Sequence, residues 1–414
     1  MSIKTKAVRL YGRNDLRLEE FELPEISDDE ILAKVVSDCV CMSSHKAALQ
    51  GATHKRVPGN IAQYPTIVGH EFSGELVKIG KKWQNDFKAG QKYSIQPALN
   101  YKGSLDAPGY SYRFIGGNAT YVIIPNEVME LNCLLPYGGD AYFYASLAEP
   151  MSCIIGGFHA NYHRTAGSYE HRMGIIEGGN MALLAGAGPM GLGAVDYAIH
   201  CGRKTGLLVV TDIDDARLSR AAQILSPEEA ARNGVKLVYL KSSDKDELLA
   251  LTDGRGYDDV FVYAPVASVV ELGDRILAAD GCLNFFAGPT SSEFSAKFNF
   301  YNVHYSGTHV VGTSGGNTDD MREALSIMEK GLVNPASMIT HVGGLDAVVE
   351  TTLNLDKIPG GKKLIYTHIS MPLTAIEDFE KIDNPVFQRL AEIVKSNNGT
   401  WCYDAEKFLL RSCL

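Results

Sequence analysis

The spacing of apolar positions changes partway along this chain of 414 residues. From residue 6 to about residue 150, short apolar stretches alternate with glycine, proline and polar turns, which is typical of twisted β-structure. Residues 33–36 predict a short strand there, and residues 38–46 a loop. The pattern therefore predicts a β-rich, irregular first domain.

After residue 150 the pattern changes to buried strands that alternate with helices. Residues 151–163 are apolar at helical spacing, and the polar residues 164–180 predict a surface loop. Short apolar runs separated by helical segments then predict a parallel, doubly wound sheet in an α/β fold. These runs are residues 181–185, 207–211, 259–263, 281–287 and 310–311.

The last hundred residues combine helical and β-like segments. Residues 319–330 predict an amphipathic helix, with Gly331 as its C-cap. Its apolar face carries Met321, Ala324, Leu325 and Met328. β-like pieces follow as far as Tyr366, and the tail from residue 368 to residue 414 predicts mainly helix.

Composition narrows the class of protein. Hydrophobic residues make up 45% of the chain and charged residues 21%, and the net charge is −10, so neither nucleic acid nor an anionic membrane is an expected partner. No apolar run reaches the roughly 18 residues that span a bilayer, and residues 1–10 lack the apolar segment of a secretory signal. Eight scattered cysteines without a Cys-x-x-Cys pair are expected to be reduced thiols. We therefore expect a cytoplasmic protein.

A glycine-rich turn follows the apolar run 181–185 and opens a helical segment. Its residues, Gly186-Ala187-Gly188-Pro189-Met190-Gly191, match the pattern G-x-G-x-x-G in the context that a dinucleotide site requires. Gly186 permits the tight turn, Gly188 lets the backbone approach a pyrophosphate, and Gly191 allows close helix packing. The free N–H groups of the helix N-terminus favour phosphate binding.

Asp212 closes the next apolar run, 26 residues after Gly186. A carboxylate roughly 20 residues after the glycine turn binds the adenosine ribose in such sites and repels a 2′-phosphate. Asp212 therefore favours NAD over NADP. The alternative is a surface aspartate that caps the following helix, since Asp214 and Asp215 stand beside it.

Four potential metal-binding groups stand out in the first 150 residues: Cys41, His70, Glu71 and Glu149. Each has an ordinary explanation when taken alone. Cys41 can be a buried thiol, His70 a core histidine and Glu149 a helix-capping carboxylate. Only their order along the chain, ahead of a dinucleotide turn, indicates that they act together as one metal site.

That order, Cys…Gly-His-Glu…Glu-Pro before the glycine turn, resembles the medium-chain dehydrogenase/reductase superfamily, and it looks closest to the zinc-dependent polyol dehydrogenases. The resemblance covers about the first 365 residues, with residues 361–366 similar to the closing strand. It implies three parts. These are a β-rich GroES-like catalytic domain (1–155 and 315–367), a Rossmann NAD-binding domain (156–314) and a helical C-terminal extension (368–414).

The resemblance also implies a ligand set. Cys41 and His70 match zinc ligands of the family, Glu71 matches the carboxylate that binds or approaches the metal, and Glu149 matches the third protein ligand. A catalytic zinc keeps an open coordination position. Residues 96–115 hold no cysteine where relatives carry a structural zinc, so one zinc per chain is expected. Carboxylate ligands leave other divalent ions open.

Two further side chains are implied in proton transfer. Ser43 matches the relay hydroxyl of the family, which passes the alcohol proton outward. Lys46 stands where many members carry a relay histidine. It can complete the relay, bind the cofactor or hold an anionic substrate, or it is a solvated surface lysine.

The substrate expectation rests on Cys41-Met42-Ser43-Ser44-His45-Lys46 and on the long C-terminal extension with residues 371–376. Both look like L-sorbose-1-phosphate reductases, which interconvert L-sorbose 1-phosphate and D-glucitol 6-phosphate. A basic cluster should then neutralise the phosphate, with His45, Lys46 and Arg56 as candidates.

Three alternatives stay open: a sorbitol-type dehydrogenase of unphosphorylated polyols, a threonine-dehydrogenase-like enzyme, and a non-catalytic dinucleotide-binding protein. NADP(H) also stays open as cofactor. The family resemblance implies a homo-oligomer, a dimer or a tetramer. The tail can pack on the nucleotide domain, extend the active-site wall or serve in assembly.

Overall fold

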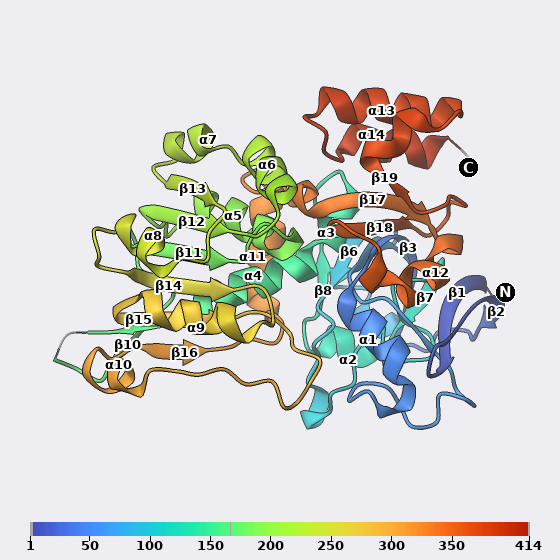
Figure 1. Cartoon of the computed structure of the whole chain (residues 1–414). Coiled ribbons are helices and arrows are strands. Elements are labelled where there is room, and N and C mark those ends of the chain that lie inside the picture. The colour runs from blue at the N-terminus through green and yellow to red at the C-terminus, as the bar shows by residue number, and fades with distance from the viewer. Residues whose placement is uncertain (1–2, 166, 413–414) are drawn as a thin grey trace. The chain divides into compact units, whose positions relative to one another are not determined.

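The computed structural model describes residues 3–165 and 167–412, which fall into two compact units (Figure 1). The β-rich unit comprises residues 1–150, 317–329 and 339–414. The parallel-sheet unit comprises residues 151–316 and 330–338. The boundary near residue 150 falls inside a helix, α4 (Ala148–Ala160).

The β-rich unit is built on an eight-stranded sheet. Its order is β19-β17-β18-β3-β5-β6-β8, with β7 paired to β3, and β3 and β5 are antiparallel neighbours. The strands are β3 (Ile31–Val40), β5 (Phe72–Ile79), β6 (Lys92–Ile95), β7 (Tyr121–Ile124), β8 (Leu134–Pro136), β17 (Ile339–Gly344), β18 (Lys362–Tyr366) and β19 (Thr374–Ala375). A smaller sheet has the order β2 (Asp15–Leu23), β1 (Ile3–Gly12), β4 (Thr66–Ile67).

Helices connect these strands. The expected loop at residues 38–46 is wrong, because β3 continues to Val40 and α1 starts at Met42. β3 pairs on both edges and is almost wholly buried, so it lacks the alternation that marks a half-exposed strand. The α-helices are α1 (Met42–Gln50), α2 (Asn126–Glu130), α3 (Tyr142–Ser146), α11 (Thr318–Glu329) and α12 (Val348–Leu353). The 3₁₀ turns are η1 (Gly51–Thr53), η2 (Lys81–Trp83), η3 (Tyr101–Gly103), η5 (Leu345–Ala347) and η6 (Leu355–Lys357).

The C-terminal extension belongs to the β-rich unit. It starts with β19, which pairs antiparallel with β17, so the mainly helical prediction missed a short strand. The turn η7 (Ile376–Lys381) and the helices α13 (Pro385–Ser396) and α14 (Tyr403–Arg411) follow. Figure 1 shows α13 and α14 side by side. Trp401, between them in the sequence, is fully buried.

The parallel-sheet unit confirms the doubly wound prediction. Its six strands are all parallel to their neighbours, in the order β13-β12-β11-β14-β15-β16. This is the strand order 3-2-1-4-5-6 of dinucleotide-binding folds. The strands are β11 (Asn180–Leu184), β12 (Leu207–Thr211), β13 (Lys236–Leu240), β14 (Tyr257–Val262), β15 (Leu277–Phe285) and β16 (His309–Val311). The helical elements are α5 (Pro189–His200), α6 (Asp215–Ile224), α7 (Pro227–Arg232), α8 (Lys245–Ala250), α9 (Ala267–Ile276), α10 (Phe300–Tyr305) and η4 (Pro335–Met338).

Three local predictions have different outcomes. The amphipathic helix near residue 319 is confirmed as α11, and its four apolar residues are buried. The loop expected over residues 164–180 is wrong in part, because β9 (Tyr162–Arg164) pairs with β10 (His171–Met173). All of β10 is exposed, so its sequence has no alternation of apolar and polar residues from which a strand could be predicted. Among the described residues, no helix is long and apolar enough to span a membrane.

Candidate metal centre and dinucleotide turn

Two adjacent strands bring Cys41 and Glu71 together. Cys41 follows the end of β3, and Glu71 precedes the start of β5, which runs antiparallel beside it. The backbone N–H of Cys39 donates to the carbonyl of Glu71 at 3.0 Å. The register of β3 against β5 therefore fixes the separation of these two side chains.

The turn before β5 is fixed by Gly69. Its φ of +94° favours glycine, and an added Cβ would overlap Asn118 and Asp38. The Asp38 carboxylate accepts from the backbone N–H of Glu71 at 3.2 Å and from the Asn118 amide. These contacts hold His70 and Glu71 in one orientation.

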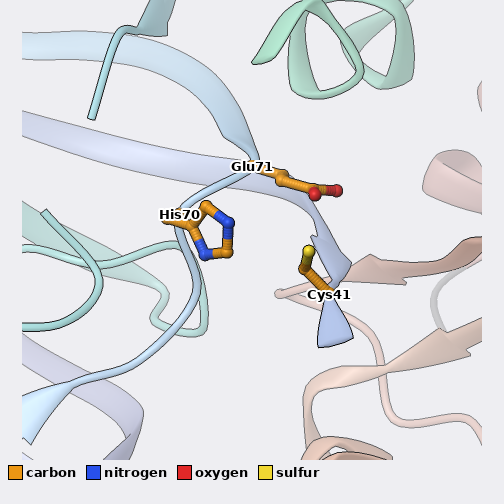
Figure 2. A group of neighbouring side chains, drawn as sticks. All are labelled: Cys41, His70 and Glu71. Atoms are coloured by element: carbon orange, nitrogen blue, oxygen red, sulfur yellow. The ribbon is translucent and has the colours of Figure 1, made fainter. Parts of the chain in front are cut away.

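The donor atoms of Cys41, His70 and Glu71 all lie within 4.8 Å of one another. Figure 2 shows the Cys41 sulfur and the Glu71 carboxylate converging beside the His70 ring. His70 and Glu71 are buried, whereas Cys41 is half-buried. A thiolate, an imidazole and a carboxylate are the ligand types of catalytic zinc sites, so this donor set fits a zinc ion.

Three neighbouring hydroxyls contact the two ring nitrogens of His70. The Ser44 hydroxyl lies 3.2 Å from Nδ1, while Nε2 lies 3.2 Å from the Ser43 hydroxyl and 3.3 Å from that of Tyr110. Burial lowers the pKa of His70, which favours the neutral ring that binds metals. A partner on one ring nitrogen is the usual way to orient a metal-binding histidine.

Lys362 holds the Glu71 carboxylate. Its Nζ lies 2.5 Å from Glu71 Oε1, and both side chains are buried. Register explains the meeting, because β18 runs antiparallel to β3 with Lys363 opposite Val40, next to Cys41. Burial raises the pKa of Glu71, and the Lys362 charge opposes this by favouring the carboxylate.

The second oxygen of Glu71, Oε2, is buried and has no hydrogen-bond partner among the residues that the structure describes. A buried acceptor left unpaired costs about 1–3 kcal/mol, so such an atom calls for an explanation. A cation between Glu71, Cys41 and His70 would satisfy it. This unpaired oxygen is the structural feature that most strongly supports a metal ion at this site.

The remaining expected site residues lie at different distances from this group. Ser43 is part of it, because its hydroxyl donates to Cys41 Sγ at 3.1 Å. Glu149, in the first turn of α4, lies outside the cluster of three, although its charge acts on His70. Lys46 is a half-buried residue of α1.

His45 is buried with Nδ1 2.7 Å from the carbonyl of Thr352, so it is no phosphate candidate.

Sequence reasoning missed Tyr110, Ser44 and Lys362. Tyr110 lies in an irregular segment with no motif to mark it. Lys362 falls within residues 361–366, for which the sequence predicted only a closing strand. Its signal was present, since two adjacent lysines in a buried strand are unusual, and the structure buries Lys362 and Lys363.

The glycine turn of the parallel-sheet unit lies between β11 and α5. A Cβ on Gly191 would overlap the carbonyl of Gly186, so the helix packs against the turn only with glycine there. A Cβ on Gly188 would meet nothing within 4 Å. Pro189 and Met190 open α5. The turn thus has the close packing and the open face that a bound pyrophosphate needs.

Asp212 directly follows β12, the parallel neighbour of β11. Its Oδ2 accepts from the backbone N–H of Ala187 at 3.3 Å, so it reaches the glycine turn. Asp214, not Asp212, caps α6 by accepting from Ala216 and Arg217. The helix-capping alternative for Asp212 is therefore wrong. Residues 201–206, between α5 and β12, account for the long spacing between Gly186 and Asp212.

Two family models match this chain. The alcohol dehydrogenase GroES-like domain matches residues 27–132, and the zinc-binding dehydrogenase domain matches residues 189–330. An L-sorbose 1-phosphate reductase from Klebsiella pneumoniae is 51% identical over 408 residues, which cover 98% of this chain and 97% of the relative. The chain belongs to the zinc-binding dehydrogenase family.

Membership of this family confirms the expected superfamily, fold class and enzyme class: the chain is a zinc-dependent dehydrogenase of the alcohol and polyol type. A mannitol-1-phosphate 5-dehydrogenase from Aliivibrio fischeri is 53% identical over 413 residues, covering 98% of this chain and 97% of the relative. A dehydrogenase structure from Sinorhizobium meliloti 1021, bound to NADP, has a TM-score of 0.70. It is 20% identical and covers 88% of this chain and 99% of its own.

Proposed function

We propose that this dehydrogenase interconverts a secondary hydroxyl and a ketone on a sugar phosphate with NAD(H), at a zinc ion bound by Cys41, His70 and Glu71. The observation that carries the proposal is the partnerless Glu71 Oε2 beside a thiol and an imidazole. Glu149, whose charge already acts on His70, is proposed as a further ligand.

A zinc ion in this group would supply Lewis-acid chemistry, which lowers the pKa of an alcohol and polarises a carbonyl. The side chains around it have separate tasks. Ser44 orients His70, and Lys362 favours the ionised form of Glu71 and holds its carboxylate in place. Tyr110 donates or accepts at His70 Nε2 and closes one side of the group.

Ser43 is proposed to carry the proton of the substrate hydroxyl. Its Oγ lies within hydrogen-bonding distance of both Cys41 Sγ and His70 Nε2, so it borders the position of the reacting oxygen. A hydroxyl there can accept one proton while it donates its own, which is what a relay needs. Lys46, three residues along α1, is the proposed next group outward.

The glycine turn and Asp212 are proposed to bind the dinucleotide. Gly188 is the N-cap of α5 and leaves open space for a pyrophosphate, which the free N–H groups of a helix N-terminus favour. Asp212 is proposed to accept from a ribose hydroxyl and to repel a 2′-phosphate, which favours NAD. An Asp212→Ala variant should reduce the ratio of kcat/KM with NAD to kcat/KM with NADP.

L-sorbose 1-phosphate is the proposed substrate, with D-glucitol 6-phosphate as the product. Similarity along the whole chain to two enzymes named for hexitol or ketose phosphates supports this choice. The second candidate is mannitol 1-phosphate, oxidised at carbon 5. Oxidation of unphosphorylated polyols and of threonine remain the less favoured alternatives.

A substrate panel tests this proposal. Purified enzyme reconstituted with zinc is given L-sorbose 1-phosphate, free L-sorbose, mannitol 1-phosphate, sorbitol and threonine, with NADH or NAD followed by absorbance and the assay repeated with a chelator. The proposal predicts turnover of a phosphorylated substrate that chelation abolishes. Turnover of sorbitol but of no phosphate ester would contradict it.

We also propose a homo-oligomer. Around α10 and the edge strand β16, the large apolar residues are exposed rather than buried: Phe300, Tyr301, Tyr305 and Val310. An exposed apolar patch beside an unpaired sheet edge is typical of an interface. Light scattering of wild-type protein and of a Tyr301→Glu, Tyr305→Glu variant checks this, since the variant should dissociate.

A further inference from the structure

A positively charged turn lies next to the metal group, at residues 54–56 after η1. Burial lowers the pKa of His54, and the charges that lower it further are all cations: Lys55, Arg56 and Lys46. The turn is therefore a local basic region on a chain whose net charge is −10. Such a region is suited to an anion rather than to a neutral polyol.

Tyr110 connects this turn to His70. Its ring stacks on His54 at 5.7 Å between centroids, and its hydroxyl lies 3.3 Å from His70 Nε2. The Arg56 guanidinium carbon lies 5.8 Å from the centre of the same ring. The Ser111 hydroxyl donates to the backbone carbonyl of Arg56 at 2.7 Å, which fastens the turn to the Tyr110 segment.

The Arg56 guanidinium has most of its hydrogen-bonding capacity unused. Across residues 3–165 and 167–412, its side chain makes one hydrogen bond, a long one of 3.5 Å to the Leu105 carbonyl, and no carboxylate lies within ion-pair distance. A guanidinium carries five N–H donors in a planar fork that matches a phosphate. Arg56 is half-buried, so its charge is less screened than that of the exposed Lys55.

We propose that Arg56 binds the phosphate of the sugar-phosphate substrate and selects it over the free polyol. This inference rests on the proposed function, because it assigns the phosphate of that substrate. Tyr110 contacts both His54 and His70, and so holds the anion-binding turn at a fixed place beside the reacting end of the substrate. Lys46 adds positive charge to the same region.

The test compares Arg56→Gln and Arg56→Lys with Lys55→Gln, a matched loss of one positive charge at the neighbouring exposed residue. Arg56→Gln should lower the ratio of kcat/KM for L-sorbose 1-phosphate to that for free L-sorbose by roughly 10- to 100-fold, the worth of charge-assisted hydrogen bonds. Arg56→Lys should recover part of it, and Lys55→Gln should change it less than about twofold. An unchanged ratio in Arg56→Gln overturns the proposal.

A second arm separates the sources of phosphate. Inorganic phosphate, titrated calorimetrically into the zinc-loaded protein, should bind wild type more tightly than Arg56→Gln, whereas the Kd of NADH should be equal in both. A weakened Kd for NADH with equal phosphate binding assigns Arg56 to the cofactor and overturns the proposal. If the wild-type enzyme turns over free polyols but no phosphate ester, the proposed function is contradicted. Binding of inorganic phosphate that depends on Arg56 would in that case still support the anion site.

Discussion

Two buried glutamates of the β-rich unit differ in how their oxygens are used. Glu71 and Glu406 are each 1% exposed. Glu406, on α14, accepts from the backbone N–H groups of Tyr142 at 2.8 Å and Phe143 at 3.1 Å, and from the Tyr366 hydroxyl at 3.2 Å. One oxygen of Glu71 is paired with Lys362, and the other has no hydrogen-bond partner in the described part of the chain.

This difference separates a structural carboxylate from a functional one. Glu406 satisfies the start of α3 and a side chain of β18, so it fastens the C-terminal extension to the sheet. The extension is therefore fastened to the β-rich unit. The free oxygen of Glu71, beside a thiol and an imidazole, is unsatisfied as long as no cation is bound. Burial raises the pKa of both carboxyls, so burial alone does not distinguish them.

The largest expected effect is the loss of catalysis when the group around Glu71 loses its thiol ligand. Cys41→Ser replaces a thiolate with a poor zinc ligand, so kcat/KM should fall at least about 10³-fold, the scale of a lost Lewis acid. The zinc content per chain should fall with it, and the free energy of unfolding of the metal-free protein should change by less than about 1 kcal/mol. Cys402→Ser, at another half-buried cysteine, is the control. Full zinc content in Cys41→Ser would contradict the account.

Lys362→Met is expected to have the largest effect on stability. It leaves the Glu71 carboxylate buried without a counter-charge, which costs about 3–5 kcal/mol in comparable pairs. Urea unfolding of the metal-free protein measures the loss. The double variant with Glu71→Gln should recover most of it, because the buried charge is gone. A double variant as unstable as the sum of both single losses would show that the pair is not coupled.

Glu406→Ala should cost about 2–4 kcal/mol, because three donors lose their acceptor. Glu406→Gln keeps one acceptor oxygen and should cost less. Zinc per chain, measured on the same samples, should stay at the wild-type value in both. Loss of zinc without loss of stability in Glu406→Ala would reverse the roles that the comparison assigns to the two glutamates.

Per pH unit, the smallest expected effect is the pH dependence of stability. Burial raises the pKa of Glu406 to about 8, against the hydrogen bonds from Phe143, Tyr142 and Tyr366. The folded protein then keeps a proton that the unfolded chain releases above its ordinary carboxyl pKa of about 4.3. Stability should thus fall as pH rises from about 5 to about 8, by about 1 kcal/mol per pH unit relative to Glu406→Gln. A difference between the two proteins that stays flat, or that grows in favour of wild type with rising pH, would contradict this.

The sequence predicted the elements with continuous local signals. Short apolar runs marked five of the six parallel strands, but not the edge strand β13, which is mostly half-buried. The glycine turn was found because it needs only neighbouring residues. Cys41, His70 and Glu71 were found because their order matches a family. The Lys362–Glu71 pair depends on the register of β18 against β3, strands more than 300 residues apart, and no local pattern encodes that register. The same limit hid Tyr110 and the contacts of Glu406.

The central claim is that Cys41, His70 and Glu71 hold a catalytic zinc, and X-ray absorption at the zinc edge tests it most directly. The account predicts one zinc per chain with a single sulfur ligand at about 2.3 Å and its other ligands nitrogen or oxygen at about 2.0–2.2 Å. In Cys41→Ser the sulfur contribution should vanish. A zinc shell without sulfur in the wild-type protein, or one with several sulfurs, would contradict the account.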